Sequence, residues 1–223
     1  MSKRYEPFLP NDMFSGIVET MGRVKAVHTL GACKRVRITK PKGWKLSLGE
    51  SVSIDGICST VVKTDASSFD VEYMPETLRK TTAAAFLPAT IVNLERSLVF
   101  GARVHGHFVM GHVDTVARVL QVQTQGRSRL ISFTVPRALS KYVVVHGSVS
   151  LNGVSLTVAR KVRNVCTVAL IPHTLAATTL GNSKFGDALN IECDMVARYG
   201  LAAFRAGGTV NGNEARKRNH TPR

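Results

Sequence analysis

The stretch SVSIDGICSTVV at residues 51–62 returns as SVSLNGVSLTVA at residues 148–159, 97 positions later. Further blocks of the two halves correspond in the same order: MPETLRKTT (74–82) with IPHTLAATT (171–179), NLE (93–95) with NIE (190–192) and, at a spacing of 95, GIVETMGRV (16–24) with GHVDTVARV (111–119). A repeat of this length indicates one structural unit that occurs twice.

The repeat divides the chain of 223 residues, a length that suits two small domains. We expect five segments: an N-terminal extension (1–12), a first copy (13–108), a second copy (109–194), a short C-terminal helix (195–206) and a basic flexible tail (207–223).

Each copy is predicted to consist of strands. Valine and isoleucine form short alternating or apolar runs, and Gly49, Gly56, Gly147 and Gly153 interrupt them as turns. Short strands at regular spacing predict an all-β protein, built from sandwiches or barrels.

Three segments have helical character. ETLRKTTAAA (76–85) and RALSKYVVV (137–145) each fit a short helix. MVARYGLAAFRA (195–206) is the best candidate, because Ala, Leu, Met and Arg favour helix and Gly207 and Gly208 would end it.

The composition excludes several classes of protein. Hydrophobic residues make up 44%, which argues against disorder, and no apolar run approaches the roughly 18 residues of a membrane helix. No secretory signal is visible, so we expect a cytoplasmic protein. The net charge of +15 could suit nucleic acid. The excess is spread along the chain without a dense basic run, which favours a merely basic surface.

The cysteines and histidines do not predict a metal site. None of the four cysteines forms a CxxC pair, so reduced thiols are expected. On a strand, His105 and His107 would share a face, with His112 nearby. No carboxylate or cysteine completes a known ligand spacing, and a place in the core, in a loop or against a substrate is favoured instead.

Polar residues follow the turn in each repeated block. Cys58 and Thr60 share one face of a strand, as do Ser155 and Thr157, because residues two apart point the same way. These side chains could point into a barrel mouth and hydrogen-bond a small ligand, or they could satisfy nearby backbone groups. The spacing alone does not choose between the two.

The repeated blocks resemble riboflavin synthases of the α-chain type. The resemblance covers residues 13–199 and rests on eight blocks in the family's order: MFSGIVETMGRV, GESVSIDGICSTV, MPETLRKTT, VNLERSL, GHFVMGHVDTVA, GSVSLNGVSLTV, IPHTLAATTLG and NIECDMVARY. Lumazine-binding fluorescent proteins share this fold and duplication, so a lumazine- or flavin-binding protein without turnover is the alternative.

The resemblance implies two tandem six-stranded antiparallel Greek-key barrels with a C-terminal helix through which a homotrimer assembles. It implies dismutation of two molecules of 6,7-dimethyl-8-ribityllumazine to riboflavin and 5-amino-6-ribitylamino-uracil, with transfer of a four-carbon unit and without metal or redox cofactor. It also implies a possible association with lumazine synthase, with no membrane or nucleic-acid partner.

The resemblance further implies a set of site residues. Cys58 and Ser155 are candidates to hold or deliver the attacking group, and His112 and Asp194 are candidates for proton transfer, with Thr157 beside them. The expected substrate-binding residues of the first barrel are Phe14, Gly16, Ile17, Val18, Ser59, Thr60, Glu72, Tyr73, Met74, Pro75, Glu76 and Thr77. Those of the second barrel are Gly111, Val113, Lys141, Leu156, Ala169, Leu170, Ile171, Pro172, His173 and Thr174. Phe14 is expected to cover the site.

The chain departs from the family's pattern at several places. Ser59 stands where the family usually has Leu, and Asp55 and Asn152 are exchanged relative to it. The extension at 1–12 could crowd the site that Phe14 should cover, and the C-terminal helix is short for a trimer contact.

Overall fold

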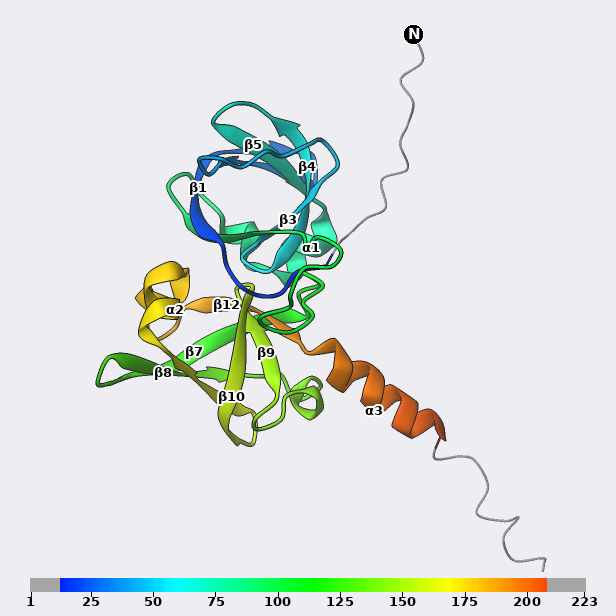
Figure 1. The fold of residues 1–223 in the computed structure, drawn as a ribbon, viewed down its shortest axis with the longest axis vertical. Coiled ribbons are helices and arrows are strands. Elements are labelled where there is room, and N and C mark those ends of the chain that lie inside the picture. The colour runs from blue at the N-terminus through cyan, green and yellow to red at the C-terminus, as the bar shows by residue number, and fades with distance from the viewer. Residues whose placement is uncertain (1–12, 208–223) are drawn as a thin grey trace, which may run out of the picture.

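The computed structural model describes residues 13–207 as two closed barrels, one above the other in Figure 1, with a helix leading away from the second. The strand order is β1-β2-β5-β4-β3-β6 in the first barrel and β10-β11-β8-β7-β12-β9 in the second. All the pairings are antiparallel, and the neighbours β2–β5 and β3–β6 are not consecutive in sequence. The expected pair of six-stranded Greek-key barrels is therefore confirmed.

The first barrel is built from β1 (Thr20–Leu30), β2 (Cys33–Thr39), β3 (Ser51–Ile54), β4 (Ile57–Thr64), β5 (Ser68–Tyr73) and β6 (Ile91–Arg96). Between β5 and β6 lie the helix α1 (Pro75–Lys80) and the 3-10 helix η1 (Thr82–Ala85). The expected helix at 76–85 is thus broken at Thr81, whose backbone is extended.

The second barrel is built from β7 (Thr115–Gln125), β8 (Ser128–Thr134), β9 (Ser148–Leu151), β10 (Val154–Val162), β11 (Val165–Leu170) and β12 (Ala188–Cys193). Its helical turns are η2 (Ser140–Tyr142), α2 (Pro172–Ala177) and η3 (Thr179–Asn182). The helix expected at 137–145 is only the turn η2. The expected C-terminal helix is present as α3 (Met195–Gly207), whereas the predicted N-terminal extension and the predicted tail beyond Gly207 lie outside the described residues.

Each barrel has its own core, because alternate residues of its strands point inward. In β4, Ile57, Ser59 and Val61 are buried, while Cys58 is half-buried and Thr60 is exposed. The pair Cys58 and Thr60 therefore shares a face as expected, but it is the outer face of the barrel. Of the two arrangements that the spacing leaves open, the one in which these side chains point into the barrel is excluded, since apolar side chains fill the interior.

A symmetrical hydrogen-bond network joins the two barrels. The Asn93 amide donates to the Asn152 carbonyl at 2.9 Å, and the Asn190 amide donates to the Asp55 carbonyl at 2.8 Å. Asp55 and Asn152 play the same part in the two turns, because each side chain accepts from the backbone N–H of the asparagine in its own barrel. Burial raises the pKa of Asp55 to about 7, a charge cost that Asn152 does not carry.

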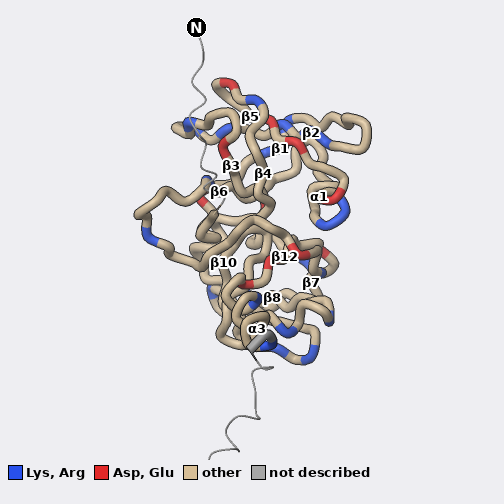
Figure 2. Tube along the Cα trace, turned by 90° about the vertical axis from the view of Figure 1, so that its right-hand side faces the viewer, with Lys and Arg blue, Asp and Glu red and all other residues tan. Residues whose placement is uncertain are grey.

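The structure bears on the charge, the membrane helices and the metal sites that the sequence raised. In the view of Figure 2, Lys and Arg lie on both barrels. Within residues 13–207, no helix is both long and apolar enough to cross a membrane. The same residues hold no group of three His, Cys, Asp or Glu that could bind a metal ion, and His105 and His107 lie in a loop, not on a strand.

Candidate active site

The segment that precedes each barrel in the sequence lies on the other barrel. Phe14 and Val109 pair as an isolated β-bridge, with N–O distances of 2.7 and 3.0 Å. After this bridge, Gly16 lies on the second barrel, where its carbonyl accepts from the N–H of Ser155 at 2.7 Å. Gly111 lies on the first barrel in the same way, accepting from the N–H of Cys58 at 2.9 Å.

The crossing corrects the expected grouping of the site residues. The family resemblance places residues 16–18 in the first barrel and residues 111–113 in the second. The structure places each segment on the other barrel, and Val18 and Val113 pack against the second and first cores respectively. The strands β4 and β10 are thus each covered by a segment from the opposite half of the chain.

The first candidate face, on the first barrel, combines the outer side of β4 with the end of β5 and the start of α1. Cys58 lies beneath the crossing segment, and the exposed Met74 contacts Cys33 through sulfur at 3.6 Å. The Glu72 carboxylate is paired with Arg35, and that of Glu76 is paired with Arg79 and Lys80, so both carboxylates are neutralised locally. The remaining expected residues of this face, Thr60, Pro75 and Thr77, are exposed or half-buried.

Several expected contact residues point into the barrels instead. Ser59 hydrogen-bonds the hydroxyl of Tyr73 at 3.1 Å inside the first barrel, and burial raises the pKa of Tyr73. Leu156 and Leu170 belong to the second core, and Phe14 is fully buried at the crossing. Because strand residues alternate between faces, only the backbone of these positions can face a ligand. Phe14 does not lie over an exposed site in the described chain.

The second candidate face, on the second barrel, repeats the first, and among residues 13–207 it has one side chain more. Ser155 is half-buried and Thr157 exposed on the outer side of β10, and the end of β11 with the start of α2 adds Ala169, Ile171, Pro172, His173 and Thr174. The addition is His107, whose Nδ1 lies 2.7 Å from Oγ of Ser155. The sequence leaves His107 open as a core, loop or substrate-contacting residue, because nothing in the local pattern shows that its loop folds back onto β10.

Three other expected residues lie outside the strands that form these faces. Asp194 caps α3, where its carboxylate accepts from the N–H of Val196 at 2.9 Å. His112 is exposed beside Gly111 and lines a cavity of about 490 Å³ together with Phe100 and Phe108. Lys141 lies on η2, with Nζ 4.8 Å from the ring centre of Tyr142, and no contact of the described residues joins it to Ser155.

The comparisons with known proteins agree with this geometry. A family model described as the lumazine binding domain matches residues 15–97 and again residues 110–194, one match for each barrel. The riboflavin synthase of Photobacterium phosphoreum is 37% identical over 194 residues, covering 84% of this chain and 87% of that protein. That of Brucella abortus is 38% identical over 193 residues, covering 84% of this chain and 96% of that protein. The chain belongs to the riboflavin synthase family.

Solved structures support the family's fold in this chain. LumP complexed with 6,7-dimethyl-8-(1'-D-ribityl) lumazine superposes with a TM-score of 0.73 at 22% identity, covering 80% of this chain and 98% of that one. LumP complexed with riboflavin gives a TM-score of 0.76 at the same identity, covering 81% and 98%. At this identity the likeness concerns the fold alone.

Two buried carboxylates hold the crossing segments of this family member in place. Glu95 accepts from the N–H and hydroxyl of Ser15 at 2.7 and 2.8 Å and from the N–H of Gly16 at 3.1 Å. Glu192 accepts from the N–H of Met110 at 2.7 Å. Burial raises the pKa of Glu95 to about 6 and that of Glu192 to about 7, although the backbone N–H donors act in the opposite direction.

These carboxylates predict a pH-dependent stability. A folded-state pKa above the ordinary 4.5 means that the folded chain binds the proton more tightly, so stability falls as pH rises from about 4.5 to about 7. Glu192→Gln removes this titration. We expect the variant to gain on the order of 2–3 kcal/mol relative to wild type between pH 4.5 and pH 8. Urea unfolding of both proteins across this range measures the difference, and parallel curves would contradict the assignment.

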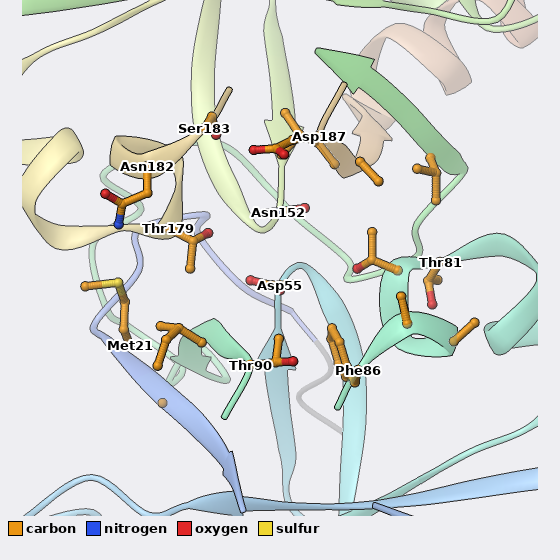
Figure 3. A pocket seen from close by; sticks show the side chains of 18 of the residues that line it. Met21, Asp55, Thr81, Phe86, Thr90, Asn152, Thr179, Asn182, Ser183 and Asp187 are labelled. Carbon is orange, nitrogen blue, oxygen red and sulfur yellow. The ribbon is translucent and has the colours of Figure 1, made fainter. Parts of the chain in front are cut away.

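A cavity of about 1100 Å³ lies elsewhere, between the barrels beside the Asp55 and Asn152 turns (Figure 3). Its walls carry equivalent residues of the two copies, such as Arg23 with Arg118 and Thr82 with Thr179. None of the expected site residues lines it. The cavity and the two candidate faces are therefore separate parts of the molecule.

Proposed function

We propose that this chain catalyses the dismutation of two molecules of 6,7-dimethyl-8-ribityllumazine to riboflavin and 5-amino-6-ribitylamino-uracil. One observation carries the proposal: the outer faces at Cys58 and Ser155 are built alike, each under a crossing segment of the opposite half. Two copies of one binding face suit a reaction that consumes two copies of one substrate. Family membership supports the assignment to a transferase.

The proposed reaction needs no external oxidant, since the four-carbon unit lost by one lumazine is gained by the other. One substrate loses a proton from its C7 methyl group, and the other is attacked at a ring carbon. Residues on the two faces orient the rings, and Cys58 and Ser155 hold or deliver the attacking group. His112 and Asp194 remain the candidates for proton transfer, within a site that supplies positioning and polar stabilisation.

We propose that the two faces meet between subunits of a homotrimer in the cytoplasm. The faces lie on the outside of separate barrels, which leaves each open to a neighbouring copy. Along α3, Val196, Tyr199 and Phe204 expose 65%, 58% and 79% of their surface, which suits a helix that packs against others. The solution mass of the intact chain tests the trimer. An association with lumazine synthase rests on family resemblance and is tested by co-purification.

The direct test is incubation of the purified protein with 6,7-dimethyl-8-ribityllumazine in the presence of a chelator. We expect riboflavin fluorescence to appear, with one riboflavin formed for two lumazines consumed. A strict metal requirement or a one-to-one ratio would refute the proposed reaction. Tight ligand binding without riboflavin formation would instead support the alternative of a lumazine- or flavin-binding protein.

The inequality of the two faces gives a sharper prediction. A thiol is more acidic and more nucleophilic than a hydroxyl, so Cys58 and Ser155 should treat the same ligand differently. We expect Cys58→Ser to lower turnover on the order of tenfold, which corresponds to about 1.4 kcal/mol. Lumazine affinity should change little, because Ser keeps a hydrogen-bonding group. Steady-state rates and fluorescence titrations of the folded variant decide this, and wild-type turnover would remove Cys58 from the chemistry.

A further inference from the structure

The loop that joins the two barrels folds onto Ser155. At Gly106 an added Cβ would lie 2.8 Å from Cβ and 2.9 Å from Oγ of Ser155, so the loop backbone lies directly against this side chain. The next residue, His107, places Nδ1 2.7 Å from Oγ of Ser155. Its own N–H donates to the carbonyl of Ser15 at 3.1 Å. Ser15 is in turn held by the carboxylate of Glu95.

These contacts fix His107 from two sides, and among residues 13–207 its imidazole has one hydrogen-bond partner, the hydroxyl of Ser155. Burial lowers the pKa of His107, while the carboxylate of Asp194 partly offsets this effect. A neutral ring can accept through Nδ1 and carry its proton on Nε2. In that tautomer the Ser155 hydroxyl donates to His107, and the lone pairs of Oγ are left for a ligand on the second face.

We propose that His107 is a positioning residue of the second face, which holds Ser155 as a hydrogen-bond acceptor toward the bound lumazine. The proposal rests on the proposed function and adds a residue to it. Protonation of His107 would turn the hydrogen bond around, so that the imidazolium donates to Oγ of Ser155. The charged groups on the elements packed against the loop are Glu95 of β6, acting through Ser15, and Asp194 after β12.

Four variants test this arrangement. His107→Leu removes the acceptor, and we expect turnover to fall about tenfold. His107→Asn places an amide group near the Nδ1 position but cannot titrate. We expect it to keep more turnover than His107→Leu and to lack the fall in turnover at acid pH that protonation of His107 should cause in wild type. The matched control is His105→Asn on the same loop, which should behave as wild type. Ser155→Ala should lower turnover by about the same factor as His107→Leu.

The double variant Ser155→Ala/His107→Leu separates positioning from a general structural role. If His107 acts through Ser155, the double variant is no slower than Ser155→Ala alone. Additive losses, wild-type turnover in His107→Leu, or an unchanged pH profile in His107→Asn would each overturn the proposal. Thermal unfolding of every variant shows whether it is folded.

Lumazine fluorescence titration keeps this result distinct from the proposed reaction. If wild type forms no riboflavin, the reaction is refuted, but His107→Leu and Ser155→Ala must still weaken lumazine binding by the same factor relative to His105→Asn. Unchanged binding in His107→Leu would then overturn the positioning role.

Discussion

Gly111→Ala is expected to remove at least about 3 kcal/mol of stability and to lower turnover roughly 100-fold. Gly111 has φ +72°, and a Cβ there would lie 2.7 Å from both N and Cβ of Cys58. The backbone of a buried strand cannot yield cheaply, so the crossing segment must move off the first face. A displacement of about 1 Å at a reacting group is enough for a loss of this size.

Gly126→Ala is the matched control. Gly126 lies in the turn between β7 and β8 with φ +59°, and nothing lies within 4 Å of an added Cβ. It carries the same left-handed backbone cost, about 1 kcal/mol, without the collision. Chemical unfolding and riboflavin formation are measured for both variants. The difference between the variants separates the effect of the collision with Cys58 from the cost of the left-handed backbone. Equal losses in the two variants would mean that the close approach to Cys58 contributes nothing.

Arg198→Met is the second change with a large expected effect. Arg198 of α3 forms an ion pair with Asp114, whose side chain is only 9% exposed and whose other oxygen accepts from the N–H of Cys193 at 2.9 Å. Its guanidinium also lies 5.6 Å from the ring centre of Tyr142. Removing the charge leaves a nearly buried carboxylate unpaired. We expect the free energy of unfolding to fall by about 2 kcal/mol. This is less than the roughly 3–5 kcal/mol lost when a fully buried ion pair is broken, because Arg198 is partly exposed.

The control for Arg198→Met is Arg205→Met in the last turn of the same helix, where the side chain is exposed. Arg205→Met should change the free energy of unfolding by less than about 0.5 kcal/mol, because the side chain is exposed. Asp114 follows the crossing segment that covers Cys58, so the loss in Arg198→Met should be accompanied by weaker lumazine binding. Unfolding curves that coincide for the two variants would contradict the role of the ion pair.

Much of the fold was predictable because it follows from the sequence repeat and from the spacing of apolar and polar residues along each strand. The repeat predicted two copies, and the period of two predicted that Cys58 and Thr60 share a face. The side of the barrel was not predictable, since β4 carries apolar residues on both faces: Val61 is buried, yet Val62 is 41% exposed. Which face of β4 becomes the inner one is decided when the barrel closes, and closure depends on strands that are distant in sequence.

The candidate site was predicted less completely, for a different reason. Every residue that the structure brings to Ser155 from outside its own barrel is remote in sequence, and neither Gly16 nor His107 carries a local signal for its partner. The grouping that the family resemblance implies therefore placed residues 16–18 and 111–113 on the wrong barrel. The break at Thr81 was equally hidden, because ETLRKTTAAA favours helix throughout and tertiary contacts decide where it ends.

The crossing at Phe14 and Val109 has a consequence for how such a protein could arise. A single module would leave its own outer face uncovered, because the segment that covers each face comes from the other module. A one-copy ancestor would have needed to exchange these segments with a second chain around a twofold axis. Joining two such copies in one chain makes that exchange independent of concentration. One chain with two copies can also carry different residues at equivalent positions, as Cys58 and Ser155 or Asp55 and Asn152 do here.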